Sequence, residues 1–238
     1  MQEMQMPLAP VDETATMAPV EPLPRLEIDV VSDVVCPWCF IGKRQLDAAL
    51  ATHRAERPDA PPPTLRWRAY QLNPDLPVEG MARADYYQRK FGSATPPMVE
   101  RVKAAARSVG LELALERITV QPNTLKAHAL IELASDGDRQ SAMAEALFRA
   151  FFLEARDLTD DATLREVATG VGLLPDLIDA ALEEDSVRQL VAAGESDLRE
   201  YGINGVPLFI VGREDVGRVA VSGAQGVEAL LEAMRRFD

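Results

Sequence analysis

The sequence contains few cysteines and histidines, the residues that form disulfide bonds or bind metal ions. Its 238 residues include only two cysteines and two histidines. Two thiols cannot hold a chain of this length together, so its stability must come from a packed core. No apolar stretch approaches the roughly 18 residues that a membrane-spanning helix needs. Lysine and arginine number 25 against 38 Asp and Glu, a formal net charge of −13. The sequence therefore predicts a water-soluble protein that binds neither nucleic acid nor an anionic membrane surface.

The first 24 residues contain five prolines and neither lysine nor arginine. A secretion signal needs a basic start and a continuous apolar run, and both are missing. We predict that residues 1–24 form a disordered tail and that the protein is cytoplasmic. Because cytoplasmic thiols are normally kept reduced, a purely structural disulfide is a poor explanation for the two cysteines.

Both cysteines belong to one motif, Cys-Pro-Trp-Cys at residues 36–39. Before it, in residues 26–31, apolar residues first alternate with acidic ones and then follow one another, which predicts a strand. After it, apolar residues recur at helical spacing as far as His53. A second strand is predicted at 65–70, following three consecutive prolines. The motif therefore lies at a strand-to-helix junction, and strand, helix and strand form half of a thioredoxin-like core.

The middle of the sequence, residues 73–190, has a helical texture and no good strand. Signals for helix starts, or apolar residues at helical spacing, are found at Thr95-Pro96-Pro97, Asn123-Thr124, Met143 to Phe151, Asp160 and Pro175. These are N-terminal signals or apolar faces that must bury against other elements. We predict that 73–190 is a large all-helical insertion.

The end of the sequence returns to a sheet pattern. Strands are predicted at 206–211, with a proline at its entrance, and at 219–221, followed by a helix over 227–237. Together, 25–72 and 191–238 are long enough for one sheet-and-helix module. The predicted fold is α/β and thioredoxin-like: a central mixed sheet flanked by helices, with the insertion between its two halves.

The chemistry of the motif follows from its position. At the start of a helix, free backbone N–H groups and the positive end of the helix dipole stabilise an anion, so Cys36 is predicted to be the nucleophile. Pro37 fits the first helical position, where its missing N–H costs nothing. Cys39 is near enough to close a disulfide with Cys36 and is predicted to be the resolving thiol. The pair is suited to reversible thiol–disulfide exchange.

Two structural alternatives compete with this interpretation. His53 follows Cys39 at a spacing that superficially suits a zinc finger. A fourth ligand is missing, because the only other histidine, His128, lies far along the chain. We therefore predict no metal site. Inert buried cysteines are the other alternative, and a turn containing Pro37 is expected to expose rather than bury a thiol.

A second feature is Gly205-Val206-Pro207. Proline at the start of a strand is ordinary by itself. In thioredoxin-like folds, however, a cis-proline loop lies against the Cys-x-x-Cys motif, and the residue before the proline pairs with an extended substrate. We therefore predict a cis bond at Pro207 and substrate contact at Val206.

Several further motifs accompany these two. They are Ser32-Asp33-Val34-Val35 before the cysteines, Ile41-Gly42, Leu72-Asn73-Pro74, Asn123-Thr124 with Ala127-His128, Gly202-Ile203, and Ser222-Gly223-Ala224-Gln225. With them the chain, over residues 25–238, resembles the FrnE-type branch of the DsbA-like thioredoxin-fold family. The resemblance implies dithiol–disulfide oxidoreductase or isomerase activity, and kinship with 2-hydroxychromene-2-carboxylate isomerases and kappa-class glutathione transferases. Some FrnE-type proteins carry a second cysteine pair near the C-terminus, and this sequence has none.

Other residues are secondary candidates for substrate binding. Pro37 and Trp38 separate the thiols and present an apolar surface to clients. Asn73 is a candidate in the cleft, although Asn-Pro is first of all a turn signal. His128 has two interpretations, a packed histidine or a proton shuttle.

Three function classes remain open. The leading one is exchange of disulfides with client proteins, without a bound cofactor and with glutathione as a candidate thiol co-substrate. The alternative is a glutathione-dependent small-molecule isomerase or transferase, whose relatives usually carry serine where Cys36 stands. The third is a redox-sensing or holdase-type binding module without turnover.

Overall fold

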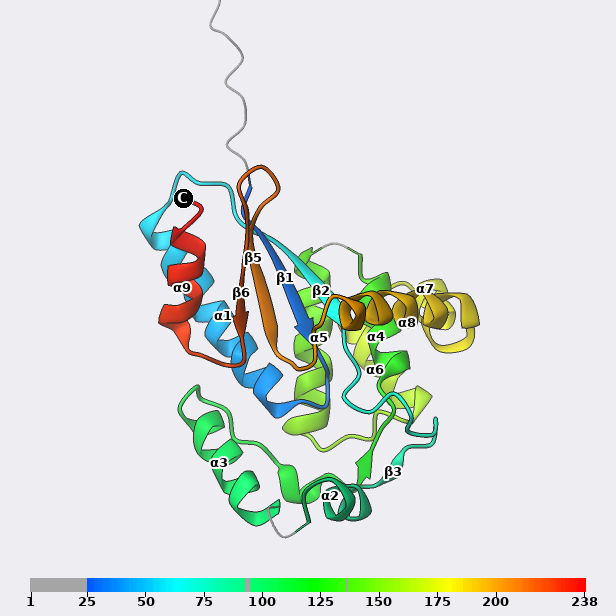
Figure 1. Ribbon diagram of the computed structural model, residues 1–238. Coiled ribbons are helices and arrows are strands. Elements are labelled where there is room, and N and C mark those ends of the chain that lie inside the picture. Colours follow the sequence, from blue (N-terminus) through cyan, green and yellow to red (C-terminus); the bar gives the residue numbers. More distant parts are fainter. Residues whose placement is uncertain (1–24, 93–94, 136) are drawn as a thin grey trace, which may run out of the picture.

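The computed structural model describes residues 25–92, 95–135 and 137–238, and the predicted tail, 1–24, lies outside the described residues. Its centre is a four-stranded sheet in the order β2-β1-β5-β6 (Figure 1). The strands are β1 (Glu27–Ser32), β2 (Thr64–Ala69), β5 (Leu208–Arg213) and β6 (Gly217–Ser222). β2 is parallel to β1, whereas β5 is antiparallel to both β1 and β6. The mixed sheet confirms the predicted fold class.

β1 is a central strand between β2 and β5, and its apolar residues are buried. Val30 lies opposite Trp67 of β2 and opposite Phe209 of β5, and all three side chains are buried. α1 (Pro37–Glu56) and α9 (Val227–Arg235) lie side by side over one face of the sheet (Figure 1). Their apolar stripes, which include Leu46 and Leu230, complete the core there.

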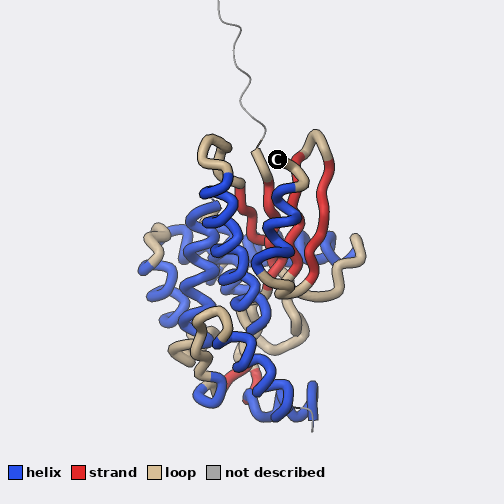
Figure 2. The backbone as a smooth tube through the Cα atoms, turned by 90° about the vertical axis from the view of Figure 1, so that its left-hand side faces the viewer, coloured by secondary structure: helices blue, strands red, loops and turns tan. Residues whose placement is uncertain are grey.

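Between β2 and β5 the chain is mainly helical (Figure 2). The helices are α2 (Arg83–Phe91), α3 (Thr95–Arg107), α4 (Leu125–Leu133), α5 (Gly137–Phe152), α6 (Asp161–Gly170), α7 (Pro175–Glu183) and α8 (Asp185–Glu200), with a 3₁₀ helix at Leu115–Arg117. Two predicted starts have the expected caps. The Asp160 carboxylate accepts from the backbone N–H groups of Ala162 and Thr163, and Pro175 is at the first position of α7.

One prediction for this region was wrong. β3 (Met81–Ala82) and β4 (Val120–Gln121) pair antiparallel where no strand was expected. Each has two residues, too few to show an alternating pattern. α2 lies in the stretch predicted to be helical, but its own start was not identified, because its sequence is mostly polar and begins without a capping side chain. α8 runs without a break across residues 190 and 191, where the predicted module boundary falls.

An aromatic cluster joins the helical region to the sheet. The rings of Phe40 from α1 and Phe148 from α5 stack with centroids 5.1 Å apart. Phe148 also meets Trp67 of β2 edge-on, and Phe152 stacks on Phe40. All four side chains are buried. α5 is therefore held against both β2 and the helix that begins with the cysteine motif.

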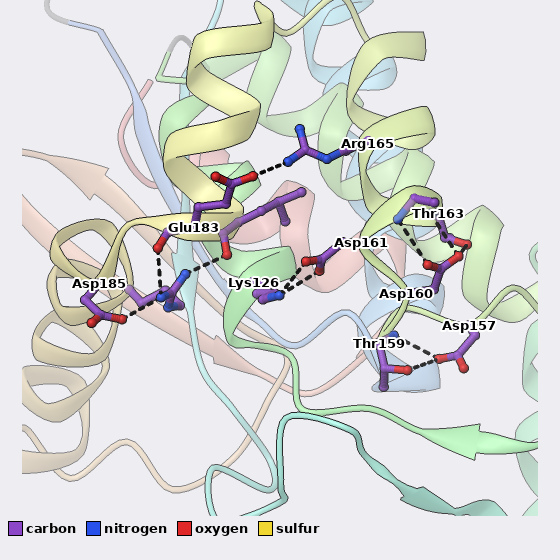
Figure 3. A network of polar contacts seen from close by, with 12 residues as sticks. Lys126, Asp157, Thr159, Asp160, Asp161, Thr163, Arg165, Glu183 and Asp185 are labelled. Atoms are coloured by element: carbon purple, nitrogen blue, oxygen red, sulfur yellow. Dashed lines mark hydrogen bonds and ion pairs between the residues drawn. The ribbon is translucent and has the colours of Figure 1, made fainter.

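Ion pairs then tie the outer helices together (Figure 3). The Lys126 ammonium lies 2.7 Å from the Asp161 carboxylate, which links α4 to α6. Arg165 of α6 pairs with Glu183 of α7 at 2.5 Å. These pairs are partly exposed, so water and salt screen them and each adds little to stability. Within the described ranges, no helix is both long enough and apolar enough to cross a membrane.

Candidate functional site

The cysteine motif begins α1 directly after β1. The Cys36 N–H donates to the Asp33 carbonyl at 3.0 Å, which closes the turn that leaves the strand. Cys36 is the N-cap residue in an extended conformation, and Pro37 opens the helix. The Cys39 N–H donates to the Cys36 carbonyl at 3.0 Å, so both thiols belong to the first turn. This is the geometry predicted for an anion-stabilising position.

The burial of the two thiols differs from the expectation. Both cysteines are free, with Cys36 only 4% and Cys39 only 2% exposed. The prediction that the turn exposes Cys36 was therefore wrong. The physical reason is tertiary: the loop before β5 approaches the motif from the far end of the sequence and lies against the Cys36 sulfur.

This loop contains Val206 and Pro207, and the peptide bond between them is cis. The Cys36 thiol donates to the Val206 carbonyl, with 3.8 Å between sulfur and oxygen. Gly42 of α1 makes the close approach possible, because a Cβ there would lie 3.1 Å from Pro207 Cγ and 3.0 Å from the Phe209 ring. The structure thus brings Cys36, Cys39, Val206 and Pro207 together.

Burial sets the acid–base behaviour of the second thiol. It raises the pKa of Cys39 well above the usual range of a thiol, and the hydrogen bond and charge of Cys36 act in the same direction. The Asp33 backbone N–H and the Ser32 hydroxyl favour the thiolate but do not outweigh burial. Cys39 is therefore a protonated thiol at neutral pH.

The first prediction follows from the raised pKa of Cys39 and from the position of Cys36 at the start of α1. With the native, reduced protein at neutral pH, iodoacetamide should modify Cys36 and leave Cys39 unmodified, because alkylation needs a thiolate. Modification of Cys39 in the Cys36→Ser variant should accelerate by about tenfold per pH unit in the alkaline range. Peptide mass spectrometry after a timed quench measures both sites, and the denatured protein is the control. Equal modification of both thiols at neutral pH would contradict the assignment.

Asp33, in the turn before the cysteine motif, forms a polar pair with His128 that was not predicted as a unit. Asp33 is fully buried, and its Oδ1 lies 3.3 Å from Nε2 of His128 on α4. The other carboxylate oxygen accepts from the Leu72 N–H at 2.7 Å. His128 is only 3% exposed, so its side chain lies inside the protein rather than in an open cleft. The sequence placed Asp33 and Ser32 beside the motif but gave no signal of their roles.

Trp38 and Asn73 line two different surface pockets. Trp38 is half-buried, and the Arg101 guanidinium of α3 lies 5.4 Å from its ring, beside a surface pocket of about 380 Å³. Asn73 accepts from Lys90 at 3.0 Å and from Tyr86 at 3.2 Å, and lines another pocket of about 540 Å³. Neither cysteine lines these pockets.

The structure assigns the remaining histidine to packing. His53 is buried near the end of α1, and its Nε2 lies 2.9 Å from the Asp238 carboxylate. In the part of the chain that the structure describes, no group of three or more His, Cys, Asp and Glu residues could hold a metal ion.

A mixed sheet interrupted by a helical region, with two thiols in the first turn of α1 against a proline loop, defines a thioredoxin-fold protein of the thiol oxidoreductase type. The chain belongs to the DSBA-like thioredoxin domain family, whose profile matches residues 27–235. This confirms the family resemblance, whereas the FrnE-type branch stays a prediction.

Solved structures give the same architecture. A "probable DsbA oxidoreductase", SCO1869 from Streptomyces coelicolor, is 27% identical, with a TM-score of 0.75 and 89% of each chain covered. A 2-hydroxychromene-2-carboxylate isomerase is 16% identical, with a TM-score of 0.68, covering 88% of this chain and 95% of that one. The cytosolic disulfide reductase DsbM from Pseudomonas aeruginosa, solved with glutathione, is 19% identical. Its TM-score is 0.57, and the match covers 89% of this chain and 100% of that one.

Proposed function

We propose that the protein exchanges disulfides with client proteins, as a dithiol–disulfide oxidoreductase or isomerase. One observation carries this proposal: Cys36 occupies the N-cap of α1 with its sulfur against the Val206 carbonyl, while a buried, protonated Cys39 lies one turn behind. A two-step exchange requires a nucleophile that attacks the substrate and a second thiol that resolves the mixed disulfide.

The reaction has two steps. The Cys36 thiolate attacks one sulfur of a substrate disulfide, forming a mixed disulfide and releasing the other substrate sulfur as a thiolate, which takes up a proton. Cys39 then loses its proton and attacks the Cys36 sulfur. The Cys36–Cys39 disulfide forms, and the second substrate sulfur leaves as a thiolate and is protonated. Two electrons pass from the dithiol to the substrate, and the reverse sequence oxidises a client.

Backbone recognition favours a polypeptide as the substrate. The carbonyl of Val206 lies beside the reacting sulfur, and an extended chain that displaces the Cys36 thiol from it gains a hydrogen-bond acceptor at that place. Trp38, half-buried beside the pocket with Pro97 and Met98, supplies an apolar contact for the flanking residues of a client. The FrnE-type branch and a cytoplasmic location belong to this proposal.

A glutathione-dependent reaction on a small molecule is the second candidate. The similarity to DsbM, which was solved with glutathione, and to an isomerase favours it. The cationic side chain of Arg101 lines the pocket next to Trp38 and would attract a carboxylate of glutathione. The cysteine at position 36 argues for the first candidate, because a transferase does not need a resolving pair.

A substrate comparison tests the proposal. The reduced protein should accelerate exchange in a scrambled, disulfide-containing protein, followed by recovery of that protein's activity, and Cys36→Ser should lose the acceleration entirely. The matched control is His53→Asn, a buried substitution at the far end of the same helix, which should retain it. Turnover of oxidised glutathione alone, without any effect on the protein substrate, would favour the second candidate.

A further inference from the structure

The helices α2 and α3 carry a charge opposite to that of the rest of the protein. Residues 83–107, which comprise these two helices and their connection, contain six lysine and arginine residues and two acidic ones. The whole chain, in contrast, has a formal net charge of −13. The acidic remainder of the protein repels acidic molecules, so positive potential is concentrated at α2 and α3.

This cationic region lies beside the cysteine motif. α3 contacts α1 next to the end at which α1 begins (Figure 1). Trp38, one of the two residues between the thiols, lines a surface pocket of about 380 Å³ together with Pro97, Met98 and Arg101 of α3. Because neither cysteine lines this pocket, it is suited to hold a residue that flanks the reacting residue of a substrate.

Arg101 supplies a cation to this pocket that has no anionic partner. Its side chain is exposed, and its guanidinium lies 5.4 Å from the centre of the Trp38 ring. Within the described ranges, no carboxylate pairs with it and no oxygen accepts a hydrogen bond from it. The face of an indole ring attracts a guanidinium without accepting a conventional hydrogen bond. The N–H donors of Arg101 therefore remain available to a ligand.

The neighbouring charges do not take over this role. Glu100, the acidic residue next to Arg101, lies 3.9 Å from the Lys103 ammonium, which also pairs with Glu116. Arg89 and Arg107 do not line the pocket at Trp38. These two arginines add only to the long-range attraction of the region.

We propose that Arg101 is a specificity-determining residue, which binds the carboxylate of an aspartate or glutamate close in sequence to the reacting cysteine of a client protein. The inference rests on the proposed function and names its class of client. A carboxylate accepts two parallel hydrogen bonds from a guanidinium. Pro97 and Met98 contact the methylene groups of the same acidic side chain. The other cations of α2 and α3 steer an acidic segment towards the motif.

Peptides activated as pyridyl disulfides measure this preference in the first step alone. The Cys36 thiolate attacks the peptide sulfur and forms the mixed disulfide, the sulfur–sulfur bond of the reagent breaks, and the pyridinethiolate leaves and takes up a proton. This leaving group is coloured and neutral. Each peptide has one cysteine and either glutamate or glutamine at one flanking position, and the set covers successive positions on both sides.

At neutral pH and low salt, glutamate at the preferred position should raise the second-order rate constant about fivefold over glutamine, the upper end for a partly exposed ion pair. The preference should disappear at about 1 M salt, where screening acts within about 3 Å. Arg101→Gln should bring the ratio of the two rate constants to about one. Arg101→Lys keeps the charge without the planar group and should retain part of the preference.

Arg236→Gln is the matched control, because it makes the same change of net charge on another exposed arginine. Arg236 follows the end of α9, near the far end of α1, where Asp238 contacts His53. This variant should keep the full ratio of rate constants. The melting temperatures of the variants should equal that of the unchanged protein, since both arginines are exposed.

A ratio of one at each position in the unchanged protein would overturn the inference, as would a preference that Arg101→Gln retains or that Arg236→Gln loses equally. Oxidised glutathione is the second substrate. If Arg101→Gln slows only its reaction, the pocket binds a glutathione carboxylate and the assignment to client proteins is wrong. Absence of reaction with any peptide would contradict the proposed function and the inference together, whereas equal rates would contradict the inference alone.

Discussion

Cys39→Ser, expressed in cells, should accumulate covalent adducts that reducing agents release. Cys36 still attacks in this variant, but the mixed disulfide has lost its internal nucleophile. In the structure no other thiol replaces it, because the sequence has only these two cysteines. Non-reducing gels and mass spectrometry of the purified variant should show several protein partners on Cys36. The expected change is from essentially no trapped species to a substantial fraction of the protein.

Cys36→Ser is the matched control, since it changes the same atom type one helical turn away and should trap nothing. The double variant should behave in the same way. Adducts with glutathione or another small thiol, and no protein adducts, would contradict exchange with client proteins and support the second candidate. Covalent adducts of the Cys36→Ser variant would mean that Cys39 is the nucleophile and Cys36 the resolving thiol.

Phe148→Ala should lower the free energy of unfolding by about 3–5 kcal/mol, the range for truncation of a buried phenylalanine. Its ring is fully buried and contacts Phe40, Phe152 and Trp67, so the loss leaves a cavity where α1, α5 and β2 meet. For a chain of this size, we expect the melting temperature to fall by roughly 6–20 °C. Calorimetry and denaturant unfolding measure the change.

Val78→Ala is the control for this variant. Its side chain is 62% exposed, so the expected change is within about 0.5 kcal/mol. A Phe148→Ala protein as stable as the control would show that the helical region does not depend on this cluster.

Most elements of the fold were predictable because their signals are local. Asp160 and Pro175 mark helix starts through their own chemistry, and the apolar run before Cys36 predicts β1 whatever surrounds it. β3 and α2 had no such signal. Met81–Ala82 is a strand only because Val120–Gln121 lies next to it, a contact between segments distant in sequence.

The residues of the functional site show the same contrast between local signals and long-range contacts. Cys36, Cys39 and the proline loop were identified from motifs whose chemistry is contained in a few residues. The contact between Asp33 and His128 spans 95 residues and depends on how α4 packs, which periodicity does not reveal. The burial of Cys36 depends on Val206 in the same manner, and for that reason the exposure of the thiol was predicted wrongly.

The position of Val206 has a consequence for synthesis on the ribosome. The Cys36 sulfur and the carbonyl that it contacts are 170 residues apart. At roughly 5–20 residues per second, on the order of 10 to 30 s pass between the synthesis of one and the other. During this interval β1 lacks its partner β5, and no loop shields the thiol. Until that loop is made, the Cys36 sulfur therefore lacks the contact that covers it in the folded protein.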